Sequence, residues 1–206
     1  MIDGKALLAR LRALAPEQRR AALVAAGDFA ARQVDGDWPS WARPGQRPER
    51  DDWHVWVIMA GRGFGKTRAG AEWVSAKARA CGEARIALVA ATPDEARRVM
   101  VEGRGGLFAA ATDGEERRTM RWGPAIGRLT FASGAQAFVY SGADGESLRG
   151  AELHFAWCDE LAKWRRAEKA WDNLMLALRA GARPQAVLTS PPRSGPALKR
   201  VLAVDE

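Results

Sequence analysis

One short stretch decides the fold of this chain: Val57-Ile58-Met59-Ala60-Gly61-Arg62-Gly63-Phe64-Gly65-Lys66-Thr67. A short apolar run leads into a glycine-rich turn, and Gly-Lys-Thr then begins a helical pattern. The glycines let the backbone turn sharply and direct several N–H groups towards one point, where the helix adds its positive dipole. In such a loop Lys66 reaches the β- and γ-phosphates of a nucleotide, and the Thr67 hydroxyl binds Mg²⁺. The stretch therefore predicts a P-loop that binds a nucleoside triphosphate.

The stretch departs from the P-loop pattern at one position. The pattern has a glycine five residues before the glycine of Gly-Lys-Thr, and this chain has Ala60 there. A glycine turn between any strand and any helix is the alternative interpretation. We favour the P-loop because strand, loop, Gly-Lys-Thr and helix follow one another in the required order.

The sequence after the loop alternates between strand and helix patterns. Strands are predicted over 55–60, 86–91, 153–158 and 186–189, helices from the loop to about 80 and over about 165–180, and hairpin strands within 119–140. Thr92-Pro93 predicts the start of a further helix. This alternation indicates an α/β fold whose mostly parallel sheet is covered by helices on both faces.

The sequence before the loop divides into two parts. Residues 4–34 follow helical spacing, so we expect an N-terminal helical arm over residues 1–37. The stretch 35–52 is polar and rich in proline and glycine, which is typical of a linker or an irregular cap. Residues 38–206 are expected to form one nucleotide-binding domain.

Two adjacent carboxylates follow a later apolar strand. Asp159 and Glu160 come directly after the run 153–158, at the carboxyl end of a predicted parallel strand, where α/β folds bind their ligands. Asp159 is placed to bind Mg²⁺, and Glu160 is placed to orient or deprotonate a water molecule. An acidic strand end that faces solvent is the alternative. The pair favours hydrolysis over phosphate transfer to an acceptor, because small-molecule kinases avoid activating water.

Composition narrows the class of protein. The 206 residues carry 32 Lys and Arg against 25 Asp and Glu, a net charge of +7. This charge favours an anionic partner such as nucleic acid, with solvated arginine-rich surfaces as the alternative. No apolar run approaches the ~20 residues of a membrane span, and the N-terminus lacks a signal-peptide pattern, so we expect a cytoplasmic protein. The spacing of the cysteines and histidines suits no metal site or disulfide, and we expect structural roles for Cys81, Cys158, His54 and His154.

With both halves of the site identified, the chain resembles the ATPase domain of phage-type large terminase subunits, the motors that drive DNA into empty capsids. It is most similar to the branch found in gene transfer agents and prophage-like elements. The resemblance runs from about residue 41 to the end, on these motifs: Arg43-Pro44-Gly45-Gln46, residues 61–73, Ser147-Leu148-Arg149-Gly150, residues 157–164 and Thr189-Ser190-Pro191. It implies a P-loop NTPase of the ASCE type, with a mostly parallel central sheet flanked by helices and a helical N-terminal arm. Terminases often carry a variant P-loop, which accounts for Ala60.

The resemblance assigns the phosphate-binding and catalytic roles. Arg62 matches an arginine that lies near the γ-phosphate, where a guanidinium stabilises the charge of the transition state; a solvated loop arginine is the alternative. Glu160 matches the catalytic glutamate. ATP and Mg²⁺ are the implied ligands, with Thr67 and Asp159 holding the metal and the loop holding the phosphates through Gly61, Arg62, Gly63, Phe64, Gly65, Lys66 and Thr67.

Four further residues receive roles from the resemblance. Gln46 matches a glutamine that contacts adenine, and a polar linker residue is the alternative. Arg149 matches an arginine that reaches a neighbouring subunit's nucleotide, and a local salt bridge is an equally good interpretation. Thr189 and Ser190 match the coupling motif that senses hydrolysis, and a simple turn at the end of a strand is the alternative.

The resemblance also implies partners. These are double-stranded DNA, the portal protein and the small terminase subunit, with a homo-oligomeric ring on the portal, a monomer in isolation and no membrane. The expected location is the host cytoplasm and, transiently, the procapsid portal. Large terminases carry a second, nuclease domain, whereas this sequence ends at Glu206, just past the coupling motif. We therefore expect no DNA cleavage by this chain, and leave open whether it hydrolyses ATP efficiently.

Two other functions fit the same residues. A helicase-like ATPase that remodels DNA shares this core and is distinguished by strand-displacement activity. A nucleotide-binding module that docks on the portal or the small subunit is distinguished by ATP binding without phosphate release.

Overall fold

The structure is a computed structural model, and it describes residues 10–11, 13–15, 17–18, 21–22, 24–25, 38–143, 145–192 and 195–203. The arm predicted over residues 1–37 lies for the most part outside the described residues. Within them, no helix is long and apolar enough to cross a membrane.

Helices and strands alternate along the described part of the chain. The helices are α3 (Trp38–Trp41), α4 (Lys66–Ala80), α5 (Pro93–Glu95), the π-helix η1 (Ala96–Val101), α6 (Gly114–Thr119), the 3₁₀ turns η2 (Glu146–Leu148) and η3 (Leu161–Lys163), α7 (Ala167–Ala177) and α8 (Pro196–Leu202). The strands are β1 (Val55–Met59), β2 (Arg85–Ala90), β3 (Arg121–Gly123), β4 (Arg128–Thr130), β5 (Gln136–Ser141), β6 (Phe155–Asp159) and β7 (Gln185–Ser190).

The described strands form a seven-stranded sheet in the order β1-β7-β6-β2-β5-β4-β3. The five strands from β1 to β5 in this order are parallel, and β4 and β3 add an antiparallel edge. The sequence predicted the parallel strands to within one or two residues but grouped β5 with the hairpin. It pairs in parallel with β2 as well as antiparallel with β4. β7 lies between the strand that precedes the P-loop and the strand that ends in the acids, as in the ASCE type.

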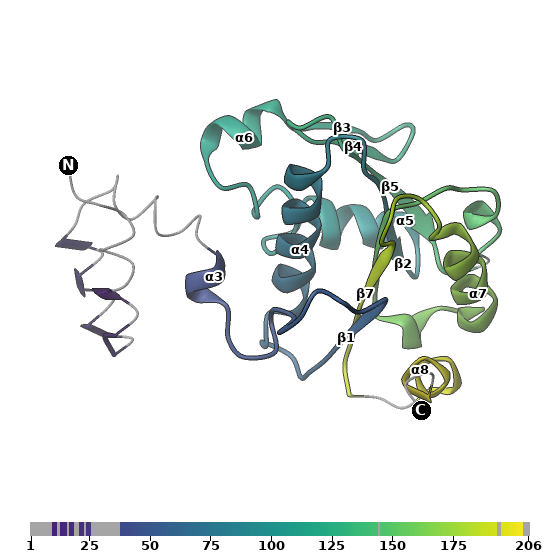
Figure 1. Ribbon diagram of the computed structural model, residues 1–206, viewed down its shortest axis with the longest axis horizontal. Helices are drawn as coiled ribbons and strands as arrows, with labels where there is room; N and C mark the ends of the chain where they lie inside the picture. Colours follow the sequence, from purple (N-terminus) through teal and green to yellow (C-terminus); the bar gives the residue numbers. More distant parts are fainter. Residues whose placement is uncertain are drawn as a thin grey trace.

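Helices pack on both faces of this sheet. On one face α4 packs against Ile86, Leu88 and Trp157, and on the other α7 and α8 pack against Ala156, Leu188 and their neighbours. Figure 1 shows α4 and α7 on opposite sides of the sheet and α6 beside the hairpin of β3 and β4. Because every parallel strand ends at the same edge, the P-loop after β1 and the acids after β6 share that edge.

Helix α4 approaches the sheet very closely at Gly70. A Cβ atom added at Gly70 would lie 2.3 Å from Cε2 of Trp157, whose side chain is fully buried. The glycine is therefore required by packing, since a helix interior otherwise favours alanine by about 1 kcal/mol.

We expect Gly70→Ala to destabilise the protein by about 2 kcal/mol, because a fully buried indole must move to admit one methyl group. Urea denaturation measures this loss. Gly114→Ala is the matched control, since the nearest atom to its added Cβ is the flexible end of Arg118 at 4.0 Å. Equal stability of the two variants would contradict the packing of Trp157 against α4.

Candidate nucleotide-binding site

The loop between β1 and α4 has the backbone that its glycines predict. Gly63 and Gly65 adopt φ angles of 78° and 91°, which side chains rarely allow. Gly65 is also the N-cap of α4 and supplies no side-chain hydrogen bond, so the first N–H groups of the helix are free of a side-chain cap and suited to an anion. Ala60 fits because its φ is not positive, and its N–H donates to the Ser190 carbonyl at 3.2 Å.

The lysine of the loop is folded over the loop itself. Its Nζ donates to the carbonyl oxygens of Ala60 at 2.7 Å and Gly61 at 3.0 Å. These two bonds hold the ammonium group of Lys66 above the turn. An incoming phosphate would find there a positioned cation together with the uncapped helix end.

Asp159 is buried at the end of β6, with only 7% of its surface exposed. Its Oδ1 accepts a 2.6 Å hydrogen bond from Thr189 Oγ1 on the neighbouring strand β7, and Trp157 Nε1 lies 3.4 Å from the same hydroxyl. Burial raises the pKa of Asp159 to about 6, against the opposing effect of the Thr189 hydrogen bond. The Thr189 hydroxyl on β7 thus orients the Asp159 carboxylate.

Glu160 has an unusual backbone. It is the one non-glycine residue with positive φ among those the structure describes, at φ 50°, a conformation that costs on the order of 1 kcal/mol and often marks functional sites. Its N–H donates to the Thr189 carbonyl at 2.8 Å. The side chain forms an ion pair with Lys163, whose Nζ also contacts Glu95 Oε1 at 3.0 Å. These two carboxylates raise the pKa of Lys163, Glu160 being the larger cause.

The two halves of the predicted site meet in one cavity. It has a volume of about 170 Å³, and its lining residues are Arg62, Lys66, Glu160, Ala162, Lys163 and Pro191. The P-loop arginine and lysine therefore share a space with the carboxylate assigned to water, while Asp159 lies one residue away on β6. Convergence of residues this far apart in the sequence is what a nucleotide-hydrolysing site requires.

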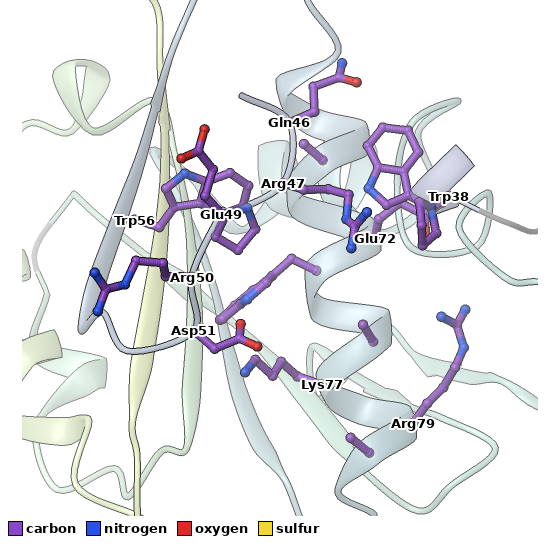
Figure 2. A pocket seen from close by; sticks show the side chains of 16 residues that line it. Trp38, Gln46, Arg47, Glu49, Arg50, Asp51, Trp56, Glu72, Lys77 and Arg79 are labelled. Carbon is purple, nitrogen blue, oxygen red and sulfur yellow. The ribbon is translucent and has the colours of Figure 1, made fainter. Parts of the chain in front are cut away.

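The side chain of Gln46 is hydrogen-bonded to the P-loop. Its Oε1 accepts the N–H of Arg43 at 2.8 Å, its Nε2 donates to the Phe64 carbonyl, and only 5% of its surface is exposed. Both polar ends of the amide are therefore used within the protein. A larger cavity of about 630 Å³ extends from Gln46 along α4. Figure 2 shows Gln46 at one end of it and Lys77 and Arg79 at the other.

Of the predicted site residues, only Arg62, Lys66 and Glu160 line the small cavity, and Arg149 and Ser190 are among those that do not. Arg149 is 68% exposed and forms an ion pair with Glu146 at 3.3 Å, so the local salt bridge that the sequence left open is present. Ser190 Oγ donates to the Pro191 carbonyl at 2.9 Å. It is buried at the end of β7, next to Thr189.

The donor atoms at the site suit Mg²⁺. The Thr67 hydroxyl and the Asp159 carboxylate offer oxygen ligands, which this hard cation prefers. Among the described residues, no group of three or more His, Cys, Asp and Glu side chains could hold a metal ion.

Sequence reasoning missed three residues of the site. Lys163 and Glu95 contact each other beside Glu160, and Trp157 contacts the Thr189 hydroxyl. Glu95 lies just after β2, at the same edge of the sheet as the acids, and this topology is the signal that could have identified it. The ion pair between Glu160 and Lys163 depends on the 3₁₀ turn η3, which the sequence did not predict.

The burial of Asp159 makes a prediction about pH. Its pKa is raised from 3.8 to about 6 in the folded state, so the stabilising effect of protonation is complete below about pH 3.8 and is lost as pH rises through about 6. Without metal or nucleotide, Asp159→Asn should be more stable than the parent at pH 7.5 by about 3 kcal/mol. The difference should vanish near pH 4. Denaturation in EDTA across this range tests it, and a pH-independent difference would contradict it.

Comparisons with known proteins give a family match and several structures of similar fold. Residues 57–204 match the family model described as terminase large subunit, T4likevirus-type, N-terminal, and no curated protein matches the chain. The fold is similar to that of the large terminase from a thermophilic bacteriophage, with a TM-score of 0.57 and 15% identity over 84% of this chain and 42% of that one. A structure of the same phage terminase in complex with ADP has a TM-score of 0.51 and 16% identity over 78% of this chain and 37% of that one.

At these identities the similarity to the thermophilic phage protein concerns the fold. The chain spans less than half of that protein's length, since 42% of the phage chain is covered. The family match covers both the P-loop and the Asp159-Glu160 pair, so it includes both halves of the site.

Proposed function

The chain belongs to the family of T4-like terminase large subunits, whose N-terminal part its residues 57–204 match, and on this premise we propose that it is an ATP-hydrolysing motor domain that translocates double-stranded DNA into a procapsid. One observation carries the proposal. Arg62, Lys66 and Glu160 line a single cavity although Glu160 is far from the other two in the sequence. The thermophilic phage terminase, which has the same fold, was solved with ADP, which supports a nucleotide as the ligand.

The proposed reaction is attack of water on the γ-phosphorus of ATP, which releases ADP and phosphate. Lys66 and the N–H groups of the loop hold the phosphates. Thr67 and Asp159 would hold Mg²⁺, which would supply positive charge to the phosphate oxygens. Glu160 orients the water and accepts its proton. The guanidinium of Arg62 stabilises the charge that develops on the transferred group.

The surrounding residues fix these groups in place. Thr189 holds the Asp159 carboxylate, and the Thr189 carbonyl holds the backbone of Glu160, so one residue of β7 contacts both acids. This arrangement supports a coupling role for Thr189 and Ser190. Gln46 holds the loop at Phe64, and contact of its amide with adenine would require it to exchange one of its present partners.

Other parts of the proposal concern assembly. Arg149 is exposed and its ion pair with Glu146 is solvent-accessible, so little energy opposes its transfer to a neighbouring subunit's nucleotide. We propose this trans role within a ring on the portal, with the small terminase subunit as a further partner and the host cytoplasm as the location. Residues 1–37 and 38–206 are the proposed arm and ATPase domain.

Phosphate release, measured with and without duplex DNA, tests the proposal. We expect Mg²⁺-dependent release of phosphate from ATP that duplex DNA stimulates. ATP binding with no release under any condition would favour the docking module instead. Strand displacement on a forked duplex would favour the helicase-like function.

A further inference from the structure

One part of the sheet is left open by the helices. The hydrophobic cluster under α7 and α8 contains buried residues of β2, β6 and β7, and the half-buried Tyr140 near the end of β5 packs against it, but it includes no residue of β3 or β4. On the opposite face, Leu129 of β4 and Ala137 of β5 are buried under the α4 side of the sheet. The antiparallel end of the sheet is therefore covered on one face only. Figure 1 shows this hairpin at the far edge of the sheet from β1.

The strand register fixes which side chains share the open face. Arg121 pairs with Thr130, which pairs with Gln136, which pairs with Arg85, so these four form one row across four strands. In the next row Arg128 pairs with Phe138. Side chains that are paired in this way point to the same face of a sheet. We call this set the arginine face; its members are Arg85, Arg121, Arg128, Thr130, Gln136 and Phe138.

The charges of the arginine face are unbalanced. It holds three arginines and no carboxylate, and none of the three forms an ion pair with the described residues. Arg85 lies over the Phe138 ring at 5.6 Å, and Arg121 donates to the Arg118 carbonyl at 2.8 Å. Arg128 is half-buried. Several arginines elsewhere in the chain pair with Asp or Glu, whereas this face keeps its positive charge uncompensated.

The spacing of the arginines suits a nucleic-acid backbone. Arg85 on β2 and Arg121 on β3 are three strands apart, about 14 Å at ~4.8 Å per strand. Arg128, on β4, lies between these two strands, in the neighbouring row that contains Phe138. The grooves of B-DNA are about 6 and 12 Å wide, so phosphates on both sides of a groove fall within the reach of such side chains. Thr130 and Gln136 add neutral hydrogen-bonding groups of the kind that contact phosphates.

We infer that the arginine face binds the sugar–phosphate backbone of duplex DNA. The inference rests on the proposed function for its choice of partner and adds the surface that meets it. Contacts of this kind carry little base specificity, as a protein that moves along DNA requires. None of the residues of the arginine face lines the cavity of Arg62, Lys66 and Glu160, so the face can be altered without touching the proposed catalytic groups.

The experiment measures binding of the chain to a labelled duplex by fluorescence anisotropy from 50 to 200 mM salt, without nucleotide. In the triple variant Arg85→Gln, Arg121→Gln, Arg128→Gln we expect affinity at 0.1 M salt to fall on the order of a hundredfold. The slope of log affinity against log salt should become shallower by about 2.7, or ~0.9 for each phosphate that is no longer neutralised.

Two further variants complete the test. Arg98→Gln, Lys199→Gln, Arg200→Gln removes the same charge from η1 and α8 and should retain most of the parent affinity. The variant Arg85→Lys, Arg121→Lys, Arg128→Lys keeps the charge and should keep the salt slope, which separates the effect of charge from that of side-chain shape. Parent-like binding by the glutamine variant, an equal loss in the control variant, or absence of duplex binding by the parent would each overturn the inference. Because nucleotide is omitted, a failure of ATP hydrolysis would count against the proposed function and not against this surface.

Discussion

Replacing Glu160 by Gln is expected to leave ATP binding intact and to lower the rate of phosphate release by about 10²–10⁴-fold. Glutamine keeps the shape of the side chain and removes its ability to accept a proton from water. The backbone of residue 160 is held by the Thr189 carbonyl, which the substitution does not alter. The change should therefore affect kcat and spare nucleotide affinity, which is the mark of a group that acts in the transition state.

The measurement is steady-state phosphate release together with nucleotide titration of both proteins. Glu152→Gln is the matched control, since Glu152 is exposed and does not line the cavity; it should behave as the parent. If the Glu160 variant released phosphate at the parent rate, another group would have to activate the water.

The second large effect is expected at Lys66. Lys66→Ala removes the cation that lies over the Ala60 and Gly61 carbonyls, and it should weaken ATP binding by about tenfold to a hundredfold, the loss of one or two charge-assisted hydrogen bonds. Unlike the Glu160 change, this one should act on binding itself. Lys199→Ala, at an exposed position on α8, should bind ATP as the parent does.

Isothermal titration with a slowly hydrolysed ATP analogue separates these cases. Unchanged affinity in the Lys66 variant would mean that the loop does not hold the phosphates. Hydrolysis need not be observed for this test, so it remains decisive if the isolated chain turns over slowly.

The sequence was sufficient to predict the elements whose signals lie in a short stretch of residues. The P-loop could be predicted because glycine, lysine and helix follow a strand within a few residues, and the strands β2, β6 and β7 could be predicted because buried parallel strands are continuous apolar runs. The start of α5 was also predictable, since Thr92 accepts the Glu95 N–H as an N-cap. Each of these signals lies within one short window of the chain.

Other features depend on contacts between distant segments. β5 resembles the hairpin strands before it, and only its pairing with β2 makes it a parallel strand. The π-helix η1 and the positive φ of Glu160 have no counterpart in local propensity. Gln46 illustrates the limit best. The family resemblance assigned it a contact with adenine, and only the structure shows that both ends of its amide are hydrogen-bonded to the backbone.

The end of β7 is bonded to its neighbours on both sides. The Ser190 carbonyl accepts the N–H of Ala60, where the P-loop begins, and the Thr189 carbonyl accepts the N–H of Glu160. Tension applied to the chain just beyond residue 190 would thus reach both the loop that is proposed to hold phosphate and the residue that is proposed to activate water. The carboxyl end of β7 is therefore a direct mechanical link between these two segments.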